Sequence, residues 1–520
     1  MLKQALDEAW DAEVMERFFA DQDAAATPRA RMSLPPTATA GRSHRPPRRC
    51  CARWPTSSAT VCWPRCSAGT PARRRAGTVL PHARWTLRTD RGWPLKIDNS
   101  PPRGTRDLLP DVVADRDRAL AIIAEVYRSY GYERIETPCL EDITRLESGE
   151  GGENEKLIFR VLRRGLPEVV GAETAVTDLV DLGLRYDLTV PLVRFYGDNH
   201  AVLPSPFRAF QVGSVWRAER PQKGRYRQFT QCDIDLLGEP SVLAECELIE
   251  ATTQALSALG LDQTVVRLGD RRILSALADA VDLPERSRPS FFVTLDKLDK
   301  IGWEGVRAEL LDRALPADSV DRLLDLVTRL EDVASAQVAD RLSQSLPALA
   351  DNVLDDLATT AACLDQLRDV RWVFDPTLVR GMGYYTGQIF EVSHPRCSSS
   401  IAGGGRYDRL LGRCMGRDVP ACGFSLGFER IMELLEAAPK PQTLALLYDV
   451  DSPLPEVLAA ARALRAQGRA VSVLPRRGQL GKQLARLEQW GFTAFAYLRK
   501  GEEPSERPLG PRPEPPSMPR

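Results

Sequence analysis

The most informative segment of the sequence is FQVGSVWRAERPQKGRYRQFTQCDIDLL, at residues 210–237. Its alternating apolar and polar residues predict two strands, at 207–219 and 227–236, which form an antiparallel hairpin around a longer loop. Successive side chains of a strand point to opposite faces, so one face of the hairpin should be polar and the other apolar. The polar face predicted in this way carries Arg217, Glu219, Gln231, Asp233 and Asp235.

The loop between the two predicted strands is strongly basic. Its four cations are Arg220, Lys223, Arg225 and Arg227. They would repel one another unless a phosphate-bearing partner lay among them. For any single charged residue of this kind, a solvated sheet face with surface ion pairs is the commoner explanation. The clustering within one loop favours a nucleotide or an RNA as ligand.

The whole chain has the size and composition of a multidomain enzyme. Its 520 residues exceed what one hydrophobic core supports, and about three or four domains are expected. No apolar run of about 18 residues occurs, so no membrane span is expected. The first residues, 1–19, carry Asp and Glu rather than a basic start and an apolar stretch, so no secretory signal is expected. The 11 cysteines lack CxxC pairs, which predicts no metal site and a reducing, cytoplasmic setting. With a net charge of -1, an RNA partner would be held by local basic clusters.

The first part of the chain, residues 1–98, does not have the composition of a folded domain. From Ala24 to Thr89 there is no acidic residue, while Arg, Pro, Cys and Trp are abundant. The segment is predicted to be disordered or to be translated upstream sequence. A basic RNA-binding arm is the alternative.

Residues 99–437 are predicted to form one catalytic domain. It should begin with a helix that Asp111 caps and Gly131 ends, followed by a short strand to Pro138. Apolar residues at helical spacing predict a helical insertion at about 270–370. Alternating apolar runs and helices at 440–500 predict a parallel sheet, and residues 501–520, rich in Pro and Glu, predict a disordered tail without packed elements.

Several motifs, in order along the chain, resemble the histidyl-tRNA synthetase branch of the class II aminoacyl-tRNA synthetases. They are PPRGTRDLLP, RYDLTVPLVRF, VWRAER, GRYRQFTQCDID, LVRGMGYYTGQIFE, AGGGRYDRL and GFSLGFERI. The resemblance implies an α+β class II catalytic core, an antiparallel sheet flanked by helices, with the helical insertion. A C-terminal α/β anticodon-binding-like domain would follow. It also implies a homodimer that uses ATP, Mg2+, L-histidine and tRNA(His).

The same resemblance implies a role for individual residues. The histidine ammonium would be bound by Asp187, Thr189 and Gln231, with Leu188 between the first two, and the imidazole by Asp235. Tyr384 and Tyr385 would close over the side chain. Arg217 would contact the α-phosphate and the histidine carboxylate, opposite the catalytic Arg380. Glu219 would meet the adenine amino group, with Arg225 and Arg430 on the phosphates. Asp187 and Thr189 are expected on one side of an extended segment, and Gly403, Gly404 and Gly405 should let the backbone approach the substrate.

Two features depart from the family pattern. Gly383 stands where the family more often has Asp, and the C-terminal domain is expected to end early, before the last helix and strand that family members usually possess. One alternative function is that of the regulatory subunit of ATP phosphoribosyltransferase, which shares the fold. Another is a histidine-activating paralogue that does not act on tRNA. The presence of Arg217, Arg380 and Arg430 argues against the regulatory subunit.

Overall fold

The computed structural model describes residues 99–147, 157–166, 174–220, 225–313, 315–331, 333–367, 369–379, 384–437, 442–499 and 504–510. The predictions for residues 1–98, for Arg380 and for Gly383 therefore lie outside the described residues.

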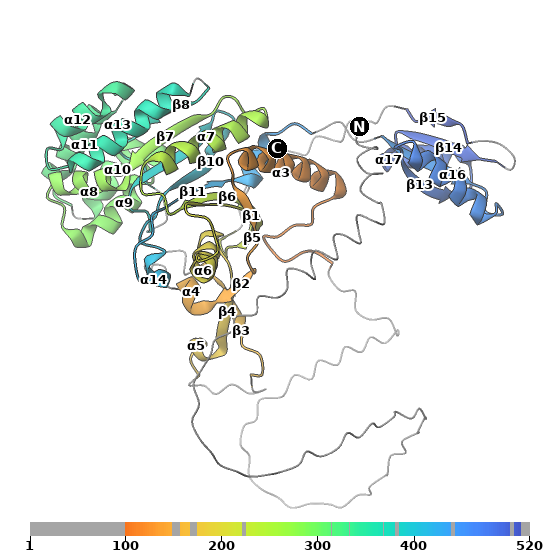
Figure 1. Ribbon diagram of the computed structural model, residues 1–520, viewed down its shortest axis with the longest axis horizontal. Helices are drawn as coiled ribbons and strands as arrows, with labels where there is room; N and C mark the ends of the chain where they lie inside the picture. The colour runs from red at the N-terminus through yellow and green to blue at the C-terminus, as the bar shows by residue number, and fades with distance from the viewer. Residues whose placement is uncertain are drawn as a thin grey trace, which may run out of the picture. The chain divides into compact units, whose positions relative to one another are not determined.

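A mixed sheet of eight strands forms the centre of the fold (Figure 1). In spatial order the strands are β1 (Glu133–Ile135), β5 (Phe207–Trp216), β6 (Gln228–Leu237), β11 (Ala421–Leu426), β10 (Cys397–Arg406), β9 (Gln388–His394), β7 (Val265–Asp270) and β8 (Arg371–Phe374). The pairs from β5 to β7 are antiparallel, as expected. The two edge strands, β1 and β8, pair in parallel with their neighbours, so the sheet is not purely antiparallel.

The predicted hairpin is present as β5 and β6. Their register pairs Gly213 with Gln231 and Gln211 with Asp233. Cys232 and Ile234, on the other face of β6, are fully buried in a core that also contains residues of α3 (Pro110–Ser129) and α7 (Leu243–Ala258). Because two helices cover one face of the sheet, the polar side chains of β6 are directed to the other face.

Helix α3 begins differently from the prediction. Its N-cap is Leu109, which makes no side-chain capping bond, and Pro110 occupies the start of the helix. Proline is favoured at the first helical position because its fixed φ suits the helix and its missing N–H is not needed there. Asp111 therefore lies inside the first turn and is not the cap. The predicted end is correct: Gly131 follows the helix with a φ of 82°.

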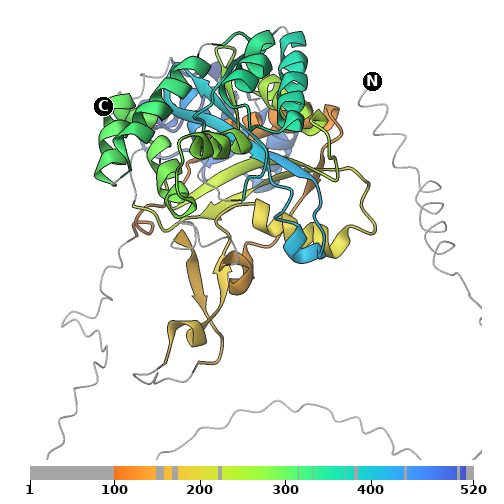
Figure 2. The same ribbon diagram turned by 90° about the vertical axis from the view of Figure 1, so that its left-hand side faces the viewer.

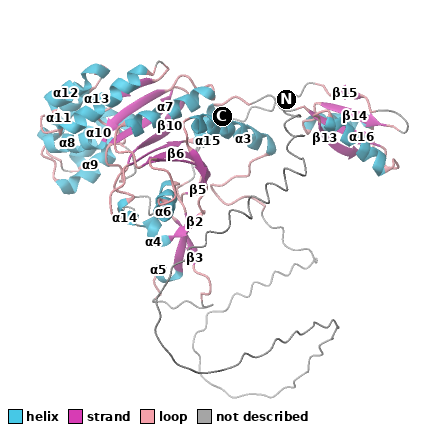
Figure 3. Ribbon diagram, viewed as in Figure 1, coloured by secondary structure: helices cyan, strands magenta, loops and turns pink. Residues whose placement is uncertain are grey.

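The region predicted as a helical insertion contains six α-helices that pack together (Figures 2 and 3). The first of them contacts β7 and β9. They are α8 (Arg271–Ala280), α9 (Arg288–Leu295), α10 (Leu298–Asp312), α11 (Ala317–Leu330), α12 (Val338–Ser345) and α13 (Asp351–Gln366), with 3-10 turns at Glu285–Ser287 and Ser335–Gln337. A smaller antiparallel sheet has the order β2 (Leu140–Asp142), β4 (Val180–Leu184), β3 (Phe159–Leu162). The short helices near it and near the main sheet are α4 (Ile143–Glu147), α5 (Val176–Leu179), α6 (Thr189–Asn199), α14 (Gly412–Met415) and α15 (Phe428–Leu434).

The C-terminal region forms its own four-stranded sheet. Its order is β13 (Ala470–Pro475), β12 (Thr443–Tyr448), β14 (Ala494–Leu498), β15 (Glu506–Pro508), with helices α16 (Leu454–Ala466) and α17 (Leu480–Gln489). The parallel pairing of β12 with β13 and β14 is the predicted one. β15 contradicts the expectation that no packed element follows residue 500, because its backbone pairs antiparallel with β14. Pairing with an existing strand requires backbone groups rather than an apolar side-chain pattern, so composition gave no sign of it.

In the described part of the chain, no helix is both long enough and apolar enough to cross a bilayer.

Candidate active site

A cavity of about 430 Å³ lies on the polar face of the main sheet. Strands β6, β10 and β11 form its floor, and the segment before α6, the loop before β6 and the start of α15 form its walls. Ten of the residues singled out from the sequence line it: Asp187, Thr189, Arg217, Glu219, Arg225, Gln231, Asp235, Tyr384, Tyr385 and Arg430. Leu188 does not, because its side chain is buried beneath the wall with 1% exposed.

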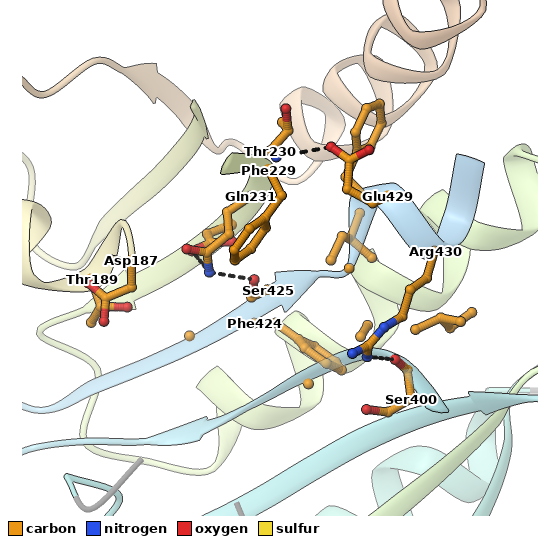
Figure 4. A pocket seen from close by; sticks show the side chains of 18 of the residues that line it. Asp187, Thr189, Phe229, Thr230, Gln231, Ser400, Phe424, Ser425, Glu429 and Arg430 are labelled. Carbon is orange, nitrogen blue, oxygen red and sulfur yellow. Dashed lines mark hydrogen bonds between the residues drawn. The ribbon is translucent and has the colours of Figure 1, made fainter. Parts of the chain in front are cut away.

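Asp187 and Thr189 lie at the beginning of α6 and not on an extended segment. The Asp187 Oδ1 accepts a hydrogen bond of 3.0 Å from the backbone N–H of Val190. A carboxylate in this position satisfies one of the open N–H groups of a helix end. The chain consequently turns into the helix at Leu188, and both residues still reach the cavity (Figure 4). The expectation of an extended segment was wrong, while the predicted proximity is correct.

Three carboxylates, those of Asp187, Asp233 and Asp235, are buried in this part of the cavity. Burial raises the pKa of Asp235 to about 7, although the Tyr407 hydroxyl, which donates to Asp235 Oδ1 at 2.5 Å, lowers it. Burial also raises the pKa of Asp233 well above its usual value, and the neighbouring charge of Asp235 adds to this effect. Carboxylates that are buried together in this way favour the binding of a cation.

The cavity also carries three arginines, of which Arg217 lies beside the carboxylates and Arg430 lies across the cavity from Asp187 (Figure 4). Arg217 donates from Nε to the carbonyl oxygen of Tyr186 at 3.0 Å, and its guanidinium lies 5.1 Å from the centre of the Phe229 ring. Arg225 lies 3.6 Å from the Glu219 carboxylate. Arg430 donates to the carbonyl oxygen of Ser400 at 2.5 Å (Figure 4). Guanidinium groups held by their neighbours in this way suit phosphate and carboxylate oxygens.

Glu429, next to Arg430, was not singled out from the sequence. Its Oε1 accepts from the backbone N–H of Thr230 on β6 at 3.1 Å (Figure 4). Arg116 of α3 donates to both of its oxygens, at 2.8 and 2.9 Å, and to the Thr230 hydroxyl at 2.8 Å. Arg106 also pairs with Glu429 and lies over the Tyr226 ring. No sequence signal linked these residues, because Arg116 and Glu429 are 313 positions apart.

The glycines of β10 serve mainly to let strands approach one another. A Cβ on Gly404 would lie 2.0 Å from the Gly423 carbonyl oxygen, and one on Gly405 would lie 2.7 Å from that of Gln388. Gly403 does line the cavity, so the expectation of backbone close to the substrate applies to it alone. Gly423 on β11 has a related role that the sequence did not suggest. A Cβ there would lie 2.0 Å from Asp235 Oδ1, and its absence makes room for that carboxylate.

Within the described ranges, no group of three or more His, Cys, Asp or Glu side chains is arranged to hold a metal ion. The cavity thus combines buried acceptors with guanidinium groups, and one of these, Arg217, lies beside the acceptors. This arrangement can hold a cationic amine and an anionic phosphate next to each other.

Comparison with known proteins agrees with this geometry. The family model for histidyl-tRNA synthetase matches residues 104–431. The histidine–tRNA ligase of Leifsonia xyli subsp. xyli is 47% identical over 411 residues, which covers 77% of this chain and 95% of the relative. The crystal structure of histidyl-tRNA synthetase from Nostoc sp. PCC 7120 superimposes with a TM-score of 0.65 at 27% identity, covering 80% of this chain and 95% of the other.

A second crystal structure is that of an ATP phosphoribosyltransferase regulatory subunit/histidyl-tRNA synthetase from Bacillus halodurans C. It superimposes with a TM-score of 0.62 at 22% identity, over 78% of this chain and all (100%) of the other. At that identity it shows the shared fold alone. The match of the family model and the extent of the similarity to the Leifsonia protein identify the family. The chain belongs to the histidyl-tRNA synthetase family.

Proposed function

We propose that the cavity is where this chain, as a histidine–tRNA ligase, joins L-histidine to the α-phosphate of ATP, with release of pyrophosphate, before transfer to tRNA(His). One observation carries the proposal: buried carboxylates and guanidinium groups line a single cavity. Histidine brings an ammonium and an imidazole N–H, and ATP brings phosphates. Both sets of groups therefore meet complementary charges within one site.

In this proposal Asp187, Thr189 and Gln231 bind the α-ammonium and Asp235 accepts from the imidazole. Tyr384 and Tyr385, whose ring centres are 4.9 Å apart, cover the side chain. The Tyr407 hydroxyl, by donating to Asp235 Oδ1, leaves Oδ2 of the same carboxylate for the ring N–H. A pocket that pairs polar groups of its substrate can reject analogues without them by a factor of about 10⁴ or more, so no editing domain is required.

Arg217 contacts the α-phosphate and the histidine carboxylate, and Glu219 meets the adenine amino group. Arg225 and Arg430 bind the outer phosphates. A carboxylate oxygen of histidine attacks the α-phosphorus in line as the bond to pyrophosphate breaks. Negative charge grows on the phosphoryl oxygens in this step, and fixed guanidinium groups stabilise it without reorganisation. Arg380 is proposed to supply such charge opposite Arg217.

Mg2+ is proposed to arrive with ATP. Since the described residues form no cluster of three metal-binding side chains, the phosphates and water supply most of its ligands. This is the usual way in which proteins hold Mg2+ at nucleotide sites. The ion would neutralise phosphate charge while the arginines orient the α-phosphate.

The domain division is proposed in the same way. Residues 99–437 form the catalytic domain, with the helical insertion at about 270–370, and residues 440–500 form an anticodon-binding-like domain. The order of strands and helices in the C-terminal sheet supports the second assignment. We also propose that the chain forms a homodimer and that it acts in the cytoplasm.

The two alternative functions each lack support from a specific observation. A regulatory subunit of ATP phosphoribosyltransferase would not need Arg217 and Arg430 directed into a cavity that also holds buried carboxylates. A paralogue that activates histidine without tRNA would share this site entirely, so only an assay with tRNA separates it from the ligase.

Histidine-dependent exchange of pyrophosphate into ATP by the purified chain tests the activation step. Exchange should require L-histidine and Mg2+ and stay at background with other amino acids. Transfer of labelled histidine to tRNA(His) tests the second step. Robust exchange with several unrelated amino acids would overturn the assignment, and exchange without transfer would favour the paralogue.

A further inference from the structure

Four buried oxygen atoms in the cavity have no hydrogen-bond partner among the described residues. They are Asp187 Oδ2, Gln231 Oε1, Asp233 Oδ1 and Asp235 Oδ2. Each belongs to a side chain that is at most 9% exposed. Buried acceptors are nearly always paired in native proteins, and leaving them unpaired costs stability. A group of four around one cavity therefore indicates a ligand with several N–H donors.

The number of donors on histidine equals the number of these acceptors. An α-ammonium has three N–H groups and a neutral imidazole has one. Of these four oxygens, the proposed function uses Asp187 Oδ2 and Gln231 Oε1 for the ammonium, together with the Thr189 hydroxyl, and Asp235 Oδ2 for the ring. It leaves one buried oxygen, Asp233 Oδ1, without a partner.

We propose that Asp233 is a specificity-determining residue whose carboxylate is a direct ligand of the substrate α-ammonium. This inference rests on the proposed function of the site. It means that two carboxylates, Asp187 and Asp233, select the ammonium group, whereas Asp235 selects the ring.

The position of Asp233 on the sheet suits this role. It lies on β6 between Gln231 and Asp235 and on the same face as both. Gln231 donates from Nε2 to Asp233 Oδ2 at 3.4 Å and to the Ser425 hydroxyl at 3.2 Å. The first contact occupies Oδ2 of the Asp233 carboxylate, and Oδ1 remains for a ligand. Asp233 is 4% exposed, so water cannot easily replace that ligand.

The charges around Asp233 also favour a cation. Asp235 and Asp187 repel its ionised form, and Arg217 attracts it. Ser425 on β11 and Gln211 on β5, which face it across the sheet, are uncharged. An ammonium placed between Asp187 and Asp233 would relieve the repulsion that the free site contains. Removing the charge of Asp233 should therefore weaken substrate binding and leave the ligand-free protein at least as stable as the wild-type protein.

Asp233→Asn tests the inference, because it removes the charge and keeps the shape. In pyrophosphate exchange with the full chain, the KM for L-histidine should rise about tenfold or more, the usual effect of losing a charge-assisted hydrogen bond. The KM for ATP should change less than about twofold, and the melting temperature without ligand should not fall. A structural role would instead lower the melting temperature and raise both KM values together.

Two inhibitors distinguish the ammonium from the ring. Histidinol carries both groups, and 3-(imidazol-4-yl)propionate lacks the ammonium. Asp233→Asn should reduce the preference for histidinol over the propionate about tenfold. Asp235→Asn, the comparison variant, should weaken both inhibitors and leave the preference unchanged.

If Asp233→Asn has the wild-type KM for histidine and the wild-type inhibitor preference, Asp233 is no ligand and the inference fails. Absence of histidine-dependent exchange in the wild-type protein is a different result, since it overturns the proposed function itself.

Discussion

Arg116 of α3 binds both carboxylate oxygens of Glu429, the residue that directly precedes Arg430 in α15. The guanidinium also lies 4.7 Å from the centre of the Phe428 ring. Despite the burial of Glu429, which raises its pKa, Arg116 and the Thr230 N–H hold that pKa below its usual value. The N-terminal helix of the domain thus fixes the helix start from which Arg430 reaches the cavity.

Arg116→Ala should destabilise the fold by about 3 kcal/mol, since it leaves a largely buried carboxylate without its main partner. Arg116→Lys should restore little of this, because an ammonium cannot span two carboxylate oxygens as guanidinium does. Chemical denaturation measures both. The matched control is Arg134→Ala: Arg134 pairs with Glu136 on the surface, where both side chains are more than half exposed. That variant should lose less than about 1 kcal/mol, and equal losses for the two arginines would contradict the expectation.

Tyr407→Phe should move the pH dependence of histidine activation. Asp235 must be ionised to accept from the imidazole, so kcat/KM for histidine should fall as the pH drops through about 7. The Tyr407 hydroxyl lowers the pKa of Asp235, and its removal should shift this acidic limb to higher pH. The titration of free histidine affects both proteins equally, so the difference between the two profiles reports on Asp235. Identical limbs would show that Asp235 does not control the profile.

The stability of the ligand-free protein should decrease as the pH rises, whereas kcat/KM for histidine should increase. The folded-state pKa of Asp235, about 7, lies above the value of about 3.9 for an unfolded aspartate. The folded state then binds the proton more tightly, and its stabilising contribution is complete below about pH 4 and lost as the pH rises to about 7. Chemical denaturation of the wild-type protein and of Asp235→Asn between about pH 4 and about pH 7 measures this loss of stability. The variant should show a smaller decrease, and parallel curves would contradict the assignment of the pKa.

Arg380→Ala should lower the rate constant of adenylation by about 10² or more, with a much smaller change in histidine affinity. The physical reason is that charge on the α-phosphate grows only in the transition state. Arg380→Lys should rescue poorly. Single-turnover kinetics separates the rate constant from binding. Equal weakening of ATP and histidine binding with an unchanged rate constant would show that Arg380 is a binding residue.

Removal of residues 1–98 should leave both the melting temperature and the exchange rate unchanged, since the composition of this segment cannot build a core. A chain that starts at Asn99 compared with the full chain provides the measurement. A clear loss of either quantity would make the segment part of the enzyme.

The residues on β6 were predictable because the alternation of a strand is local. It correctly placed Gln231, Asp233 and Asp235 on one face, although no role was assigned to Asp233. The helical position of Thr189 was not predictable from spacing alone, since the Asp187 carboxylate caps α6 and turns the chain. The Arg116–Glu429 pair could not be predicted from the sequence, for another reason. It joins distant parts of the sequence, and neither residue has a local pattern that indicates its partner.

Strand β15 has a consequence for how the C-terminal sheet meets other proteins. An uncovered strand edge offers a row of N–H and C=O groups on which a second chain can assemble, which leads to aggregation. β15 covers one side of β14, and it is short and ends at Pro508, which has no N–H to donate. A brief strand that ends in proline is a poor template for further pairing. The three residues of β15 should therefore affect aggregation at high protein concentration more than they affect the activation of histidine.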